Sequence, residues 1–597
     1  MFKRTHTCGE LTSSNVDQTT SLNGWVYRTR DHGGLIFIDL RDRYGITQIK
    51  FDENDSKEAF LTAKALSIED VISVKGTVVS RDSEAINKEL LTGEIEVNIE
   101  SIIILNESKP LPFMISDREG ASEETRLKYR YLELRTDQMQ KNMLIRHKTY
   151  QEVRKYLSSN DFIEFETPVL MRATPEGARD FLVPSRLHKG QFYALPQSPQ
   201  QYKQILMVSG FDRYFQIVKC FRDEDFRADR QPEFTQIDIE MSFIDESDIK
   251  KSVEELVCSI FKNVINYELK NKFPRISYNE ALETYGSDKP DLRFDLKLVD
   301  FIKYTSQSNF SAVKDLSTVK AIVVPNAEGY SRKVIDELID FVKEFSSQSK
   351  KTPLSGLAWM KFSDSDLIGG VSKFFDQDLK NEIIKSLKLN ENDLILFGAG
   401  ERETVLSTMG ALRLKIAERN DLIKHDDFKP LWVESYPLFQ KDEDTDKWTF
   451  VHHPFTSPSE KDLYSFSDDP GKAGSRAYDL VINGWEIAGG SIRNHDPKVQ
   501  VEIFKVLGFS EKEAKEKFGF LLEGLNFGAP PHGGIAFGFD RLVMILAGVK
   551  QIRDVIAFPK TTSAISLMDG SPSDIGEKQL KELGITVNRK RKNESSI

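Results

Sequence analysis

Apolar and polar positions alternate most regularly at residues 214–220 and 235–243, which are separated by a long, highly charged loop. Alternation with a period of two predicts β-strands, and the first stretch is also rich in aromatic and β-branched residues, as strands are. We therefore expect two antiparallel strands that pair as a hairpin.

The predicted hairpin carries charge on one face. Residues two apart on a strand point to the same side of a sheet. That spacing places Arg222 with Glu224 on the first strand, and Gln236, Asp238 and Glu240 on the second. Charge gathered on one face is costly unless a ligand or partner charges meet it, although the solvated outer face of an antiparallel sheet would show the same pattern.

A second stretch, residues 524–546, changes from a glycine- and proline-rich loop into a helical pattern at residues 539–547. Glycines let the backbone approach a ligand closely, and a helix N-terminus attracts phosphate through its free N–H groups and its dipole. Arg541 falls in the first helical turn, where the dipole disfavours a cation. An arginine there makes sense if it meets a phosphate or stacks on a base.

The first 105 residues alternate in short runs between Gly and Asp turns, which predicts strands at 24–30, 35–40, 46–51, 71–80 and 93–105. Five short strands fit a small OB-fold barrel, a frequent oligonucleotide binder. The first strands carry a group of basic, aromatic and polar residues: Arg28, Arg30, His32, Phe37, Arg41, Arg43 and Gln48. Aromatic and arginine side chains together suit unpaired bases, whereas a barrel without a ligand would use Phe37 as core.

The rest of the chain changes character in blocks. Residues 106–135 read as a charged linker, and residues 136–159 have helical apolar spacing before a strand at 162–166. An ordinary helix–strand unit would look the same. Residues 287–424 predict an α+β module, with a helix at 331–345 and a strand at 356–362, that carries no catalytic constellation. Residues 425–565 return to charged, turn-broken strands.

A polar group is expected where a strand meets a helix near residue 198. Ser198 followed by Pro199 predicts a helix start, and Gln200 and Lys203 follow in the first turn. With Glu176 from an earlier turn-rich loop, these side chains could hold a zwitterion, because a carboxylate and amides suit an ammonium and a lysine suits a carboxylate. A capped helix start is also a common structural feature.

Three charged residues stand near a run of small residues at 488–491. Asp479 and Glu486 offer the oxygen ligands that Mg²⁺ prefers, and such ions bridge phosphates. Arg493 could clamp a substrate carboxylate with two hydrogen bonds, since the small residues leave room for a small molecule. A surface ion pair is the alternative. The paired histidines at 452 and 453 lack an apparent third ligand for a metal.

Composition narrows the class of protein. A chain of 597 residues is too long for one core, so several domains are expected. No apolar run has transmembrane length and the N-terminus lacks a signal-peptide pattern, so we expect no membrane association. The three cysteines lie far apart in the sequence, which favours a reducing compartment, and a cytoplasmic location is expected. The net charge of −11 does not favour nonspecific nucleic-acid binding, so RNA contact needs a local basic patch.

The charged hairpin and the glycine-rich helix start, FRDED and GIAFGFDR, resemble motifs 2 and 3 of the class II aminoacyl-tRNA synthetases. Residues 136–168 are similar to motif 1, which builds the dimer interface in that family. Together with QSPQ, HHPF and GWEIAGGSIR, the chain resembles the aspartyl-tRNA synthetases of the bacterial type. The class I signatures HIGH and KMSKS and a P-loop are absent from the sequence.

The resemblance implies an α+β multidomain fold with an N-terminal OB-fold barrel, an antiparallel-sheet catalytic domain and an α+β insertion domain. The expected boundaries are 1–106 for the anticodon-binding barrel, 107–135 for a hinge, 136–286 and 425–565 for the two parts of the catalytic domain, 287–424 for the insertion and 566–597 for a C-terminal extension. The last ten residues, NRKRKNESSI, are expected to be a disordered basic tail, for which a solvated end is simpler than a nucleic-acid role.

The resemblance also implies roles for individual residues. Arg222, Glu224 and Arg541 would be catalytic. ATP would be held by Arg222, Asp223, Glu224, Gln231, Glu486, Gly538, Phe539, Asp540 and Arg541. Aspartate would be held by Glu176, Ser198, Gln200, Lys203, Arg222, Asp238, His452 and Arg493. Mg²⁺ would be held by Asp479 and Glu486, and the anticodon by Arg28, His32, Phe37 and Gln48.

The implied reaction is aspartate–tRNA ligation by a homodimer. The aspartate carboxylate attacks the α-phosphate of ATP in line, and the terminal ribose of tRNA(Asp) then attacks the aspartyl adenylate, so catalysis is positioning and charge neutralisation without a protein nucleophile. Asparagine would be rejected because Arg493 and Lys203 lose a partner when the side chain is an amide. We expect Arg493→Leu to abolish aspartate activation in a protein that still folds.

Three alternatives stay open. A related enzyme could use asparagine or lysine, although Arg493 with Lys203 favours an acidic substrate. A non-catalytic RNA-binding paralogue would lose motif residues, whereas Arg222, Glu224, Glu486 and Arg541 are present. Some members of the family also charge tRNA(Asn). His32 resembles this relaxed group, while residues 80–87, SRDSEAIN, look more like the strict one.

Overall fold

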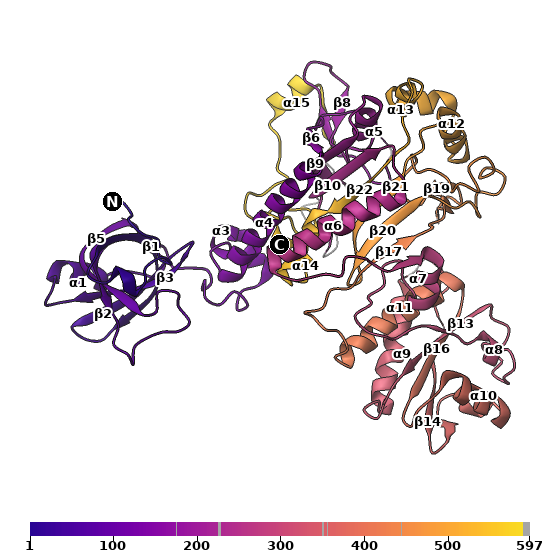
Figure 1. Cartoon of the computed structure of the whole chain (residues 1–597), viewed down its shortest axis with the longest axis horizontal. Coiled ribbons are helices and arrows are strands. Elements are labelled where there is room, and N and C mark those ends of the chain that lie inside the picture. Colours follow the sequence, from indigo (N-terminus) through magenta and orange to yellow (C-terminus); the bar gives the residue numbers. More distant parts are fainter. Residues whose placement is uncertain (175, 225–228, 349–350, 355, 443, 589–597) are drawn as a thin grey trace. The chain divides into compact units, whose positions relative to one another are not determined.

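The computed structural model describes residues 1–588 except 175, 225–228, 349–350, 355 and 443 (Figure 1). The chain forms two units, Met1–Gln140 and Lys141–Ile597. Apart from residue 588, the expected basic tail lies outside the described residues. None of the helices in the described ranges is long and apolar enough to cross a membrane.

The first unit contains a closed five-stranded barrel in the order β1-β2-β3-β5-β4, which confirms the predicted OB-fold architecture. Its strands are β1 (Thr19–Asp31), β2 (Leu35–Asp42), β3 (Gly45–Asp52), β4 (Val71–Ser80) and β5 (Ile95–Asn106), with η1 (Ser13–Asn15) before them and α1 (Lys57–Lys64) after β3. On β2, Ile36 and Ile38 lie in the barrel core while Phe37 between them is only half-buried. Phe37 is therefore not a core residue.

A buried carboxylate ties the barrel to the segment that follows it. Glu69 accepts hydrogen bonds from Arg41 at 2.9 Å and Arg135 at 2.7 Å. The predicted linker is partly helical, with α2 (Glu123–Lys128) and α3 (Arg130–Glu133). Because Arg41 is buried in this ion pair, it does not belong to an exposed RNA-facing group, and that part of the sequence interpretation is wrong.

The second unit is built on an eight-stranded sheet in the order β11-β17-β20-β21-β22-β10-β9-β6. The strands are β11 (Arg275–Ser277), β17 (Pro430–Glu434), β20 (Ala477–Ile482), β21 (Trp485–Ile492), β22 (His532–Gly538), β10 (Glu233–Ser242), β9 (Arg213–Phe221) and β6 (Ile163–Glu164). Pairing is antiparallel except at the two ends, where β11 pairs parallel with β17 and β6 parallel with β9. The predicted antiparallel catalytic sheet is confirmed in outline.

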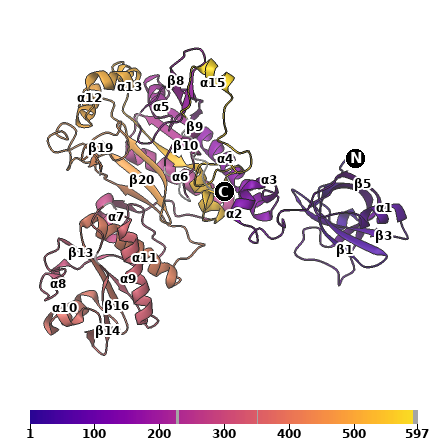
Figure 2. The same cartoon turned by 180° about the vertical axis from the view of Figure 1, so that it is seen from behind.

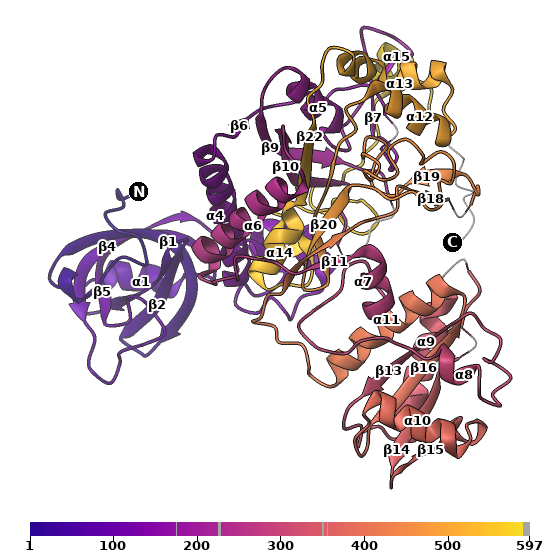
Figure 3. The ribbon, with the colours of Figure 1, turned by 45° about the vertical axis from the view of Figure 1, so that its right-hand side comes forward.

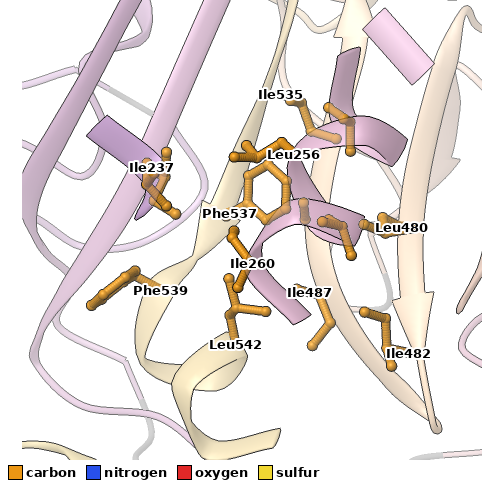
Figure 4. Packing of buried hydrophobic residues seen from close by; sticks show 14 of the residues in the cluster. Ile237, Leu256, Ile260, Leu480, Ile482, Ile487, Ile535, Phe537, Phe539 and Leu542 are labelled. Atoms are coloured by element: carbon orange, nitrogen blue, oxygen red, sulfur yellow. The ribbon is translucent and has the colours of Figure 1, made fainter. Parts of the chain in front are cut away.

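Helices α4 (Asp137–Ser159), α6 (Glu246–Ile265) and α14 (Phe539–Ala547) share one hydrophobic core with this sheet. Figure 2 shows α4 and α6 close to β10 of the sheet. Figure 4 shows Leu256 and Ile260 of α6 beside Phe537 of β22 and Leu542 of α14. The sequence positions these helices through local signals, since Asp245 and Asp248 form a capping box at the start of α6 and Gly548 ends α14 in the left-handed conformation. The helices predicted at 136–159 and 539–547 are confirmed.

The predicted hairpin is present as β9 and β10, which pair from Glu233↔Phe221 to Met241↔Arg213. On β10, Ile237 and Ile239 point into the core cluster, so the alternate residues face the other side of the sheet. The first strand, however, ends at Phe221. Arg222 and Glu224 therefore lie in the connection after the strand and not on its face, and that placement was wrong.

Residues 299–400 contain a separate five-stranded sheet in the order β12-β13-β16-β14-β15 (Figure 3). Its strands are β12 (Val299–Asp300), β13 (Thr318–Val324), β14 (Ala358–Ser363), β15 (Asp366–Ile368) and β16 (Leu394–Gly400). Helices α9 (Arg332–Ser347) and α11 (Arg402–Arg419) share one of its cores, and α8 (Ile302–Thr305) and α10 (Gln377–Leu387) share the other. An α+β module between the two halves of the larger sheet was predicted and is present.

Shorter elements complete the second unit. The strands are β7 (Leu182–Pro184), β8 (Phe192–Ala194), β18 (Phe439–Lys441) and β19 (Trp448–Phe450). The helices are α5 (Gln200–Val208), α7 (Tyr278–Tyr285), η2 (Ser372–Phe374), α12 (Pro497–Val506), α13 (Glu511–Leu525), η3 (Ile552–Val555) and α15 (Glu577–Leu583). Pro199 occupies the N-cap position of α5, one residue later than the predicted cap at Ser198.

Candidate active site

A pocket of about 410 Å³ lies against β10, β21 and β22, on the side of the sheet away from the core helices. Most of the residues predicted to act at the site line it: Glu176, Ser198, Gln200, Lys203, Arg222, Glu224, Gln231, Asp238, His452, Asp479, Glu486, Arg493, Gly538, Asp540 and Arg541. These positions span more than 350 residues of sequence, so the fold brings together what the sequence lists apart. Asp223 and Phe539 do not line the pocket.

A buried charge cluster of Lys203, Asp238, Glu240 and Arg493 lies at one wall of the pocket, and all of its members except Glu240 line the pocket. The Lys203 ammonium lies 2.7 Å from Asp238 and 3.2 Å from Glu240, and the Arg493 guanidinium forms two hydrogen bonds with Glu240 at 2.9 and 3.1 Å. Each of the four side chains is at most 2% exposed. The bidentate partner of Arg493 is therefore Glu240 of the same chain, and not a substrate carboxylate as the sequence interpretation had it.

Glu240 fits beside Arg493 because β22 has a glycine opposite it. A Cβ atom on Gly534 would lie 2.0 Å from a carboxylate oxygen of Glu240. Burial raises the pKa of Glu240, but Arg493 and Lys203 outweigh it and hold the pKa at about 2. For Asp238 burial wins over Lys203, and its pKa is raised. The sequence analysis placed Glu240 on the correct strand face but missed its role, which the period-two spacing from Asp238 could have indicated.

One further Arg493 donor also has a fixed partner. One terminal nitrogen donates to Ser491 Oγ at 2.7 Å and lies 2.5 Å from His453 Nε2. Burial, then the charge of Arg493, lowers the pKa of His453 well below its usual value, so its ring is neutral. His453 Nδ1 accepts from the Phe455 backbone N–H at 3.1 Å, so the neutral ring carries its proton on Nε2 and offers Arg493 no acceptor. Glu240 and Ser491 thus engage three of the five guanidinium N–H groups, which leaves two for a ligand. His453 was missed by the sequence analysis.

His452 lines the pocket but is turned towards other groups. Its Nδ1 lies 3.8 Å from an Asp479 oxygen, and its ring packs edge-on against Tyr436. Burial lowers the pKa of His452 to about 4, so the imidazole is neutral near pH 7.

A second wall carries the polar group at the start of α5. Ser198 Oγ donates to Glu176 at 2.8 Å and accepts from the Gln200 backbone N–H at 3.3 Å. Thr174 Oγ1 also donates to Glu176 at 3.3 Å. Burial nevertheless raises the pKa of the Glu176 carboxyl to about 7. A buried carboxylate with a raised pKa that lines a pocket is suited to a cationic ligand group, because the cation stabilises its ionised form.

The two predicted catalytic arginines are held loosely. The Arg222 guanidinium lies 5.0 Å from the centre of the Phe234 ring, and its buried Nε has no hydrogen-bond partner among the described residues. Arg541 donates to the backbone oxygen of Glu486 and lies 3.3 Å from Asp229. Both therefore retain donors for an anionic ligand. Phe234 and Asp229 were not predicted as site residues.

The other residues of the charged loop have varied surroundings. Glu224 pairs with Arg230 at 2.8 Å. Both ends of the Gln231 side-chain amide bind the backbone of Lys560, at 2.8 and 2.9 Å. Asp223 is half-exposed and its backbone N–H donates to Arg179. Its carboxylate lies 3.9 Å from the Arg179 guanidinium, and Asp223 is not among the residues that line the pocket.

Motif 3 residues also divide between site and core. Phe539 is fully buried and stacks on Tyr150 with ring centres 4.2 Å apart, so its side chain cannot reach a ligand in the pocket. Asp540 accepts from Arg146 at 2.6 Å and from the Thr235 backbone at 2.8 Å. Asp540 therefore joins α14 to α4 and β10, and Gly538 contributes backbone only.

Asp479 and Glu486 form a carboxylate pair that fits a divalent cation. A Cβ atom on Gly489 would lie 2.9 Å from an Asp479 oxygen and 3.7 Å from a Glu486 oxygen, so both carboxylates face the same space above this glycine. Burial, then the charge of Glu486, raises the pKa of Asp479 well above its usual value. A cation would relieve this repulsion. No group of three His, Cys, Asp or Glu side chains in the described ranges is arranged to hold a metal, so further ligands would come from substrate or water.

The residues predicted to read an anticodon lie in the first unit. Arg28 is exposed, and the rings of His32 and Phe37 meet edge-on with centres 5.7 Å apart. Gln48 is held by Arg30 at 2.9 Å and donates to Glu96 at 2.7 Å. The barrel thus presents an aromatic pair and a fixed amide on its outer surface.

Comparisons with known proteins agree with this architecture. A family model described as "tRNA synthetases class II (D, K and N)" matches residues 122–562, and one described as "OB-fold nucleic acid binding domain" matches residues 20–105. The solved structure of asparaginyl-tRNA synthetase from Pyrococcus horikoshii with asparaginyl-adenylate has a TM-score of 0.58 and 20% identity, and covers 94% of this chain and 99% of that one. At that identity it shows a shared fold.

Two curated relatives span nearly the whole chain. The aspartate–tRNA(Asp/Asn) ligase of Caldanaerobacter subterraneus subsp. tengcongensis is 49% identical over 590 residues and covers 98% of both chains. The aspartate–tRNA ligase of Staphylococcus saprophyticus is 48% identical over 593 residues, covering 98% of this chain and 100% of its own. The family match and these relatives confirm the expected resemblance and show that the chain belongs to the class II tRNA synthetases of the aspartate, lysine and asparagine group.

Proposed function

We propose that the protein is an aspartate–tRNA ligase, which activates L-aspartate with ATP and transfers it to the 3′ end of tRNA(Asp). The observation that carries this proposal is the buried charge cluster, in which Lys203 and Arg493 are fixed by Asp238 and Glu240 at the pocket wall. Each cation keeps a donor for a ligand, so a substrate carboxylate could meet two. The names of both curated relatives support this substrate.

Aspartate is held at both of its ends. Its side-chain carboxylate meets Arg493 and Lys203, and its ammonium meets Glu176, Ser198 and Gln200 on the second wall. A carboxylate forms charge-assisted hydrogen bonds with the remaining donors of Lys203 and Arg493, whereas an asparagine side chain offers one neutral oxygen and turns N–H donors towards cations. Discrimination therefore comes from charges that are already in place before the substrate arrives. Asp238 and His452 complete the lining of this space.

Activation is an in-line attack by the aspartate α-carboxylate on the α-phosphate of ATP, with pyrophosphate as the leaving group. Arg222 is available to the α-phosphate and Arg541 to the far end of ATP, since both keep unengaged donors. Glu224, Gln231, Gly538 and Asp540 border the nucleotide space. Asp479 and Glu486 would hold Mg²⁺, which would neutralise charge on the phosphates. No protein nucleophile is required.

The barrel reads the tRNA. The half-buried Phe37 beside His32 offers a stacking surface, and Gln48 and Arg28 offer hydrogen bonds. One relative is named for tRNA(Asp/Asn) and the other for aspartate alone, so charging of tRNA(Asn) is a second candidate function. His32 is the feature that favours it.

Dimer formation and location complete the proposal. Ile163 of the edge strand β6, with Val169 and Leu170 shortly after it, are 48–51% exposed, which suits burial by a second copy. A homodimer is therefore proposed. The free thiols Cys8, Cys220 and Cys258 suit a reducing compartment such as the cytoplasm.

The test is aminoacylation with ¹⁴C-aspartate, using purified tRNA(Asp) and tRNA(Asn) in parallel. Charging of tRNA(Asp) alone would establish a strict enzyme, and charging of both a relaxed one. Phe37→Ala should lower tRNA charging by about tenfold or more, since one stacked base contributes about 1–3 kcal/mol, without changing aspartate-dependent pyrophosphate exchange. Tyr44→Ala, which removes another exposed barrel aromatic, is the control. Charging of neither tRNA by a folded protein would refute the proposal.

A further inference from the structure

A relay of hydrogen bonds connects Pro530 to Gln200 behind the pocket wall. His532 Nδ1 lies 2.7 Å from the Pro530 carbonyl oxygen, and His532 Nε2 lies 3.1 Å from Gln204 Nε2. Gln204 Oε1 in turn accepts from Gln200 Nε2 at 3.0 Å. His532 and Gln204 are fully buried, and neither lines the pocket, whereas Gln200 does. The relay thus connects the Pro530 carbonyl to the side chain of Gln200, which lines the pocket.

The first link fixes the direction of all the others. A backbone carbonyl oxygen only accepts, so His532 Nδ1 must carry a proton. In a neutral ring Nε2 then has a lone pair and accepts, so the nitrogen of the Gln204 amide must face His532. The oxygen of Gln204 is left for Gln200, and it requires the nitrogen of the Gln200 amide. The direction of every hydrogen bond in this series follows from donor and acceptor chemistry alone.

The neutral state of His532 is consistent with its surroundings. Burial lowers the pKa of His532, and Arg493 lowers it further, while Glu240 acts in the opposite direction. The backbone of His532 is fixed as well, because the Arg493 backbone N–H donates to its carbonyl oxygen at 2.9 Å and His532 of β22 pairs with Ser242 of β10. His532, the first side chain of the relay, is therefore held rigidly.

We infer that Gln204 and His532 are positioning residues that turn the amide oxygen of Gln200 towards the pocket. No described residue donates to Gln200 Oε1, so this oxygen is available to a ligand. Together with Glu176 it presents acceptors, and no fixed donor, to the ammonium of a zwitterionic substrate. This inference rests on the proposed function, because it explains how the aspartate site would select an amino acid over a dicarboxylate that lacks the amino group.

The relay predicts a specific ligand preference. L-aspartate and succinate share two carboxylates, but succinate lacks the ammonium that would meet Gln200. Replacing Gln204 by leucine removes the partner of the Gln200 amide, which can then rotate. A hydrogen bond to a charged group is worth about tenfold or more in affinity, so Gln204→Leu should lower the affinity for L-aspartate by about tenfold. The affinity for succinate should stay within about twofold.

The experiment is isothermal titration calorimetry of the full-length protein with L-aspartate and with succinate. Gln201→Leu is a matched control on the same helix, because the Gln201 amide is equally buried and makes no hydrogen bond to a described residue. It should leave the preference for L-aspartate unchanged. His532→Gln, whose amide can donate to Pro530 and accept from Gln204, should retain the preference, whereas His532→Leu should reduce it.

Several results would overturn the relay. Equal losses of both ligands in Gln204→Leu would indicate a structural role alone, and an unchanged preference would exclude any role. If Gln204→Leu does not fold, Gln204→Met replaces it, because methionine has nearly the same volume and is a poor hydrogen-bond acceptor. If no relay variant folds while Gln201→Leu does, the relay residues have a structural role and the inference is wrong. Wild-type protein that binds no L-aspartate would instead refute the proposed function itself.

Discussion

Two arginines of the pocket, Arg493 and Arg222, are held in opposite ways. Arg493 gives three of its N–H groups to Glu240 and Ser491, in a cluster where every charge has a partner. Arg222 rests on the Phe234 ring and its Nε has no hydrogen-bond partner among the described residues, while the nearby carboxylates of Asp479 and Glu486 repel each other. One region is complete without a ligand, and the other is not.

The difference matches what each region has to recognise. The charge of an amino-acid side chain is constant, so a site that distinguishes an acid from an amide gains from groups fixed in advance. Phosphates arrive with a cation and change charge distribution during the reaction, so groups around them need unengaged donors and acceptors. We therefore expect substitutions in the buried charge cluster to affect both stability and specificity, and those around Arg222 to affect ATP and Mg²⁺ dependence.

The largest effect is expected for Arg493→Leu. Loss of the guanidinium leaves Glu240 buried with only Lys203, so kcat/KM for aspartate in pyrophosphate exchange should fall by about a thousandfold. The free energy of unfolding should also fall by about 3–5 kcal/mol, which the sequence alone did not anticipate. Chemical denaturation measures the second effect.

The control for this prediction is Arg476→Leu. Arg476 forms a comparable two-bond pair with Glu246, both bonds at 2.6 Å, but does not line the pocket. It should change stability only modestly and leave aspartate activation intact. Comparable activation by wild type and Arg493→Leu would remove the buried charge cluster from substrate recognition and with it the assigned specificity.

The next effect concerns the carboxylate pair. Asp479→Asn should lower the rate of aspartate activation by about a hundredfold, or about 3 kcal/mol, because one cation ligand and its charge are lost. It should also raise the melting temperature of the ligand-free protein, since the repulsion with Glu486 disappears. Differential scanning fluorimetry with and without Mg²⁺ checks this. A larger Mg²⁺-dependent rise in the variant than in wild type would contradict the assignment.

The sequence anticipated these two regions unequally. Period-two spacing on β10 and the glycine-rich start of α14 are local signals, and they indicated Asp238 and Arg541, which line the pocket. The partner of Arg493 could not be found in this way, because Glu240 lies 253 residues earlier and only the sheet order β21-β22-β10 brings them together. Phe539 was likewise assigned to the ATP site because it stands within motif 3, but its side chain is buried in the core beneath α14.

A tenfold effect is expected from the pH dependence of Glu176. Burial raises its pKa to about 7 in the ligand-free protein, and only the ionised form pairs with the aspartate ammonium. Hence kcat/KM for aspartate, measured at saturating ATP, should fall by about tenfold per pH unit below pH 7. The same shift means that ionised Glu176 destabilises the free protein increasingly as pH rises from its ordinary value of 4.5 towards 7.

Two observations assign the profile to Glu176, which is needed because Asp238 and Asp479 also line the pocket with raised pKa values. His452 has a pKa of about 4, so it does not titrate in this range. Glu176→Gln keeps the acceptor for Ser198 but cannot ionise, so its kcat/KM should be lower and independent of pH between 6 and 8. A wild-type profile that is flat over this interval would show that Glu176 is ionised throughout and does not limit ammonium binding.

The smallest effect is expected at the ring that supports Arg222. A cation over an aromatic face contributes about 0.5–1 kcal/mol at partly exposed sites, so Phe234→Leu should raise KM for ATP by about threefold. KM for aspartate should change less, because the buried charge cluster keeps its own partners. Pyrophosphate exchange at varied ATP, then at varied aspartate, separates the two constants. An increase confined to KM for aspartate would mean that Arg222 is positioned for the amino acid and not for the phosphate, and would reverse the contrast between the two arginines.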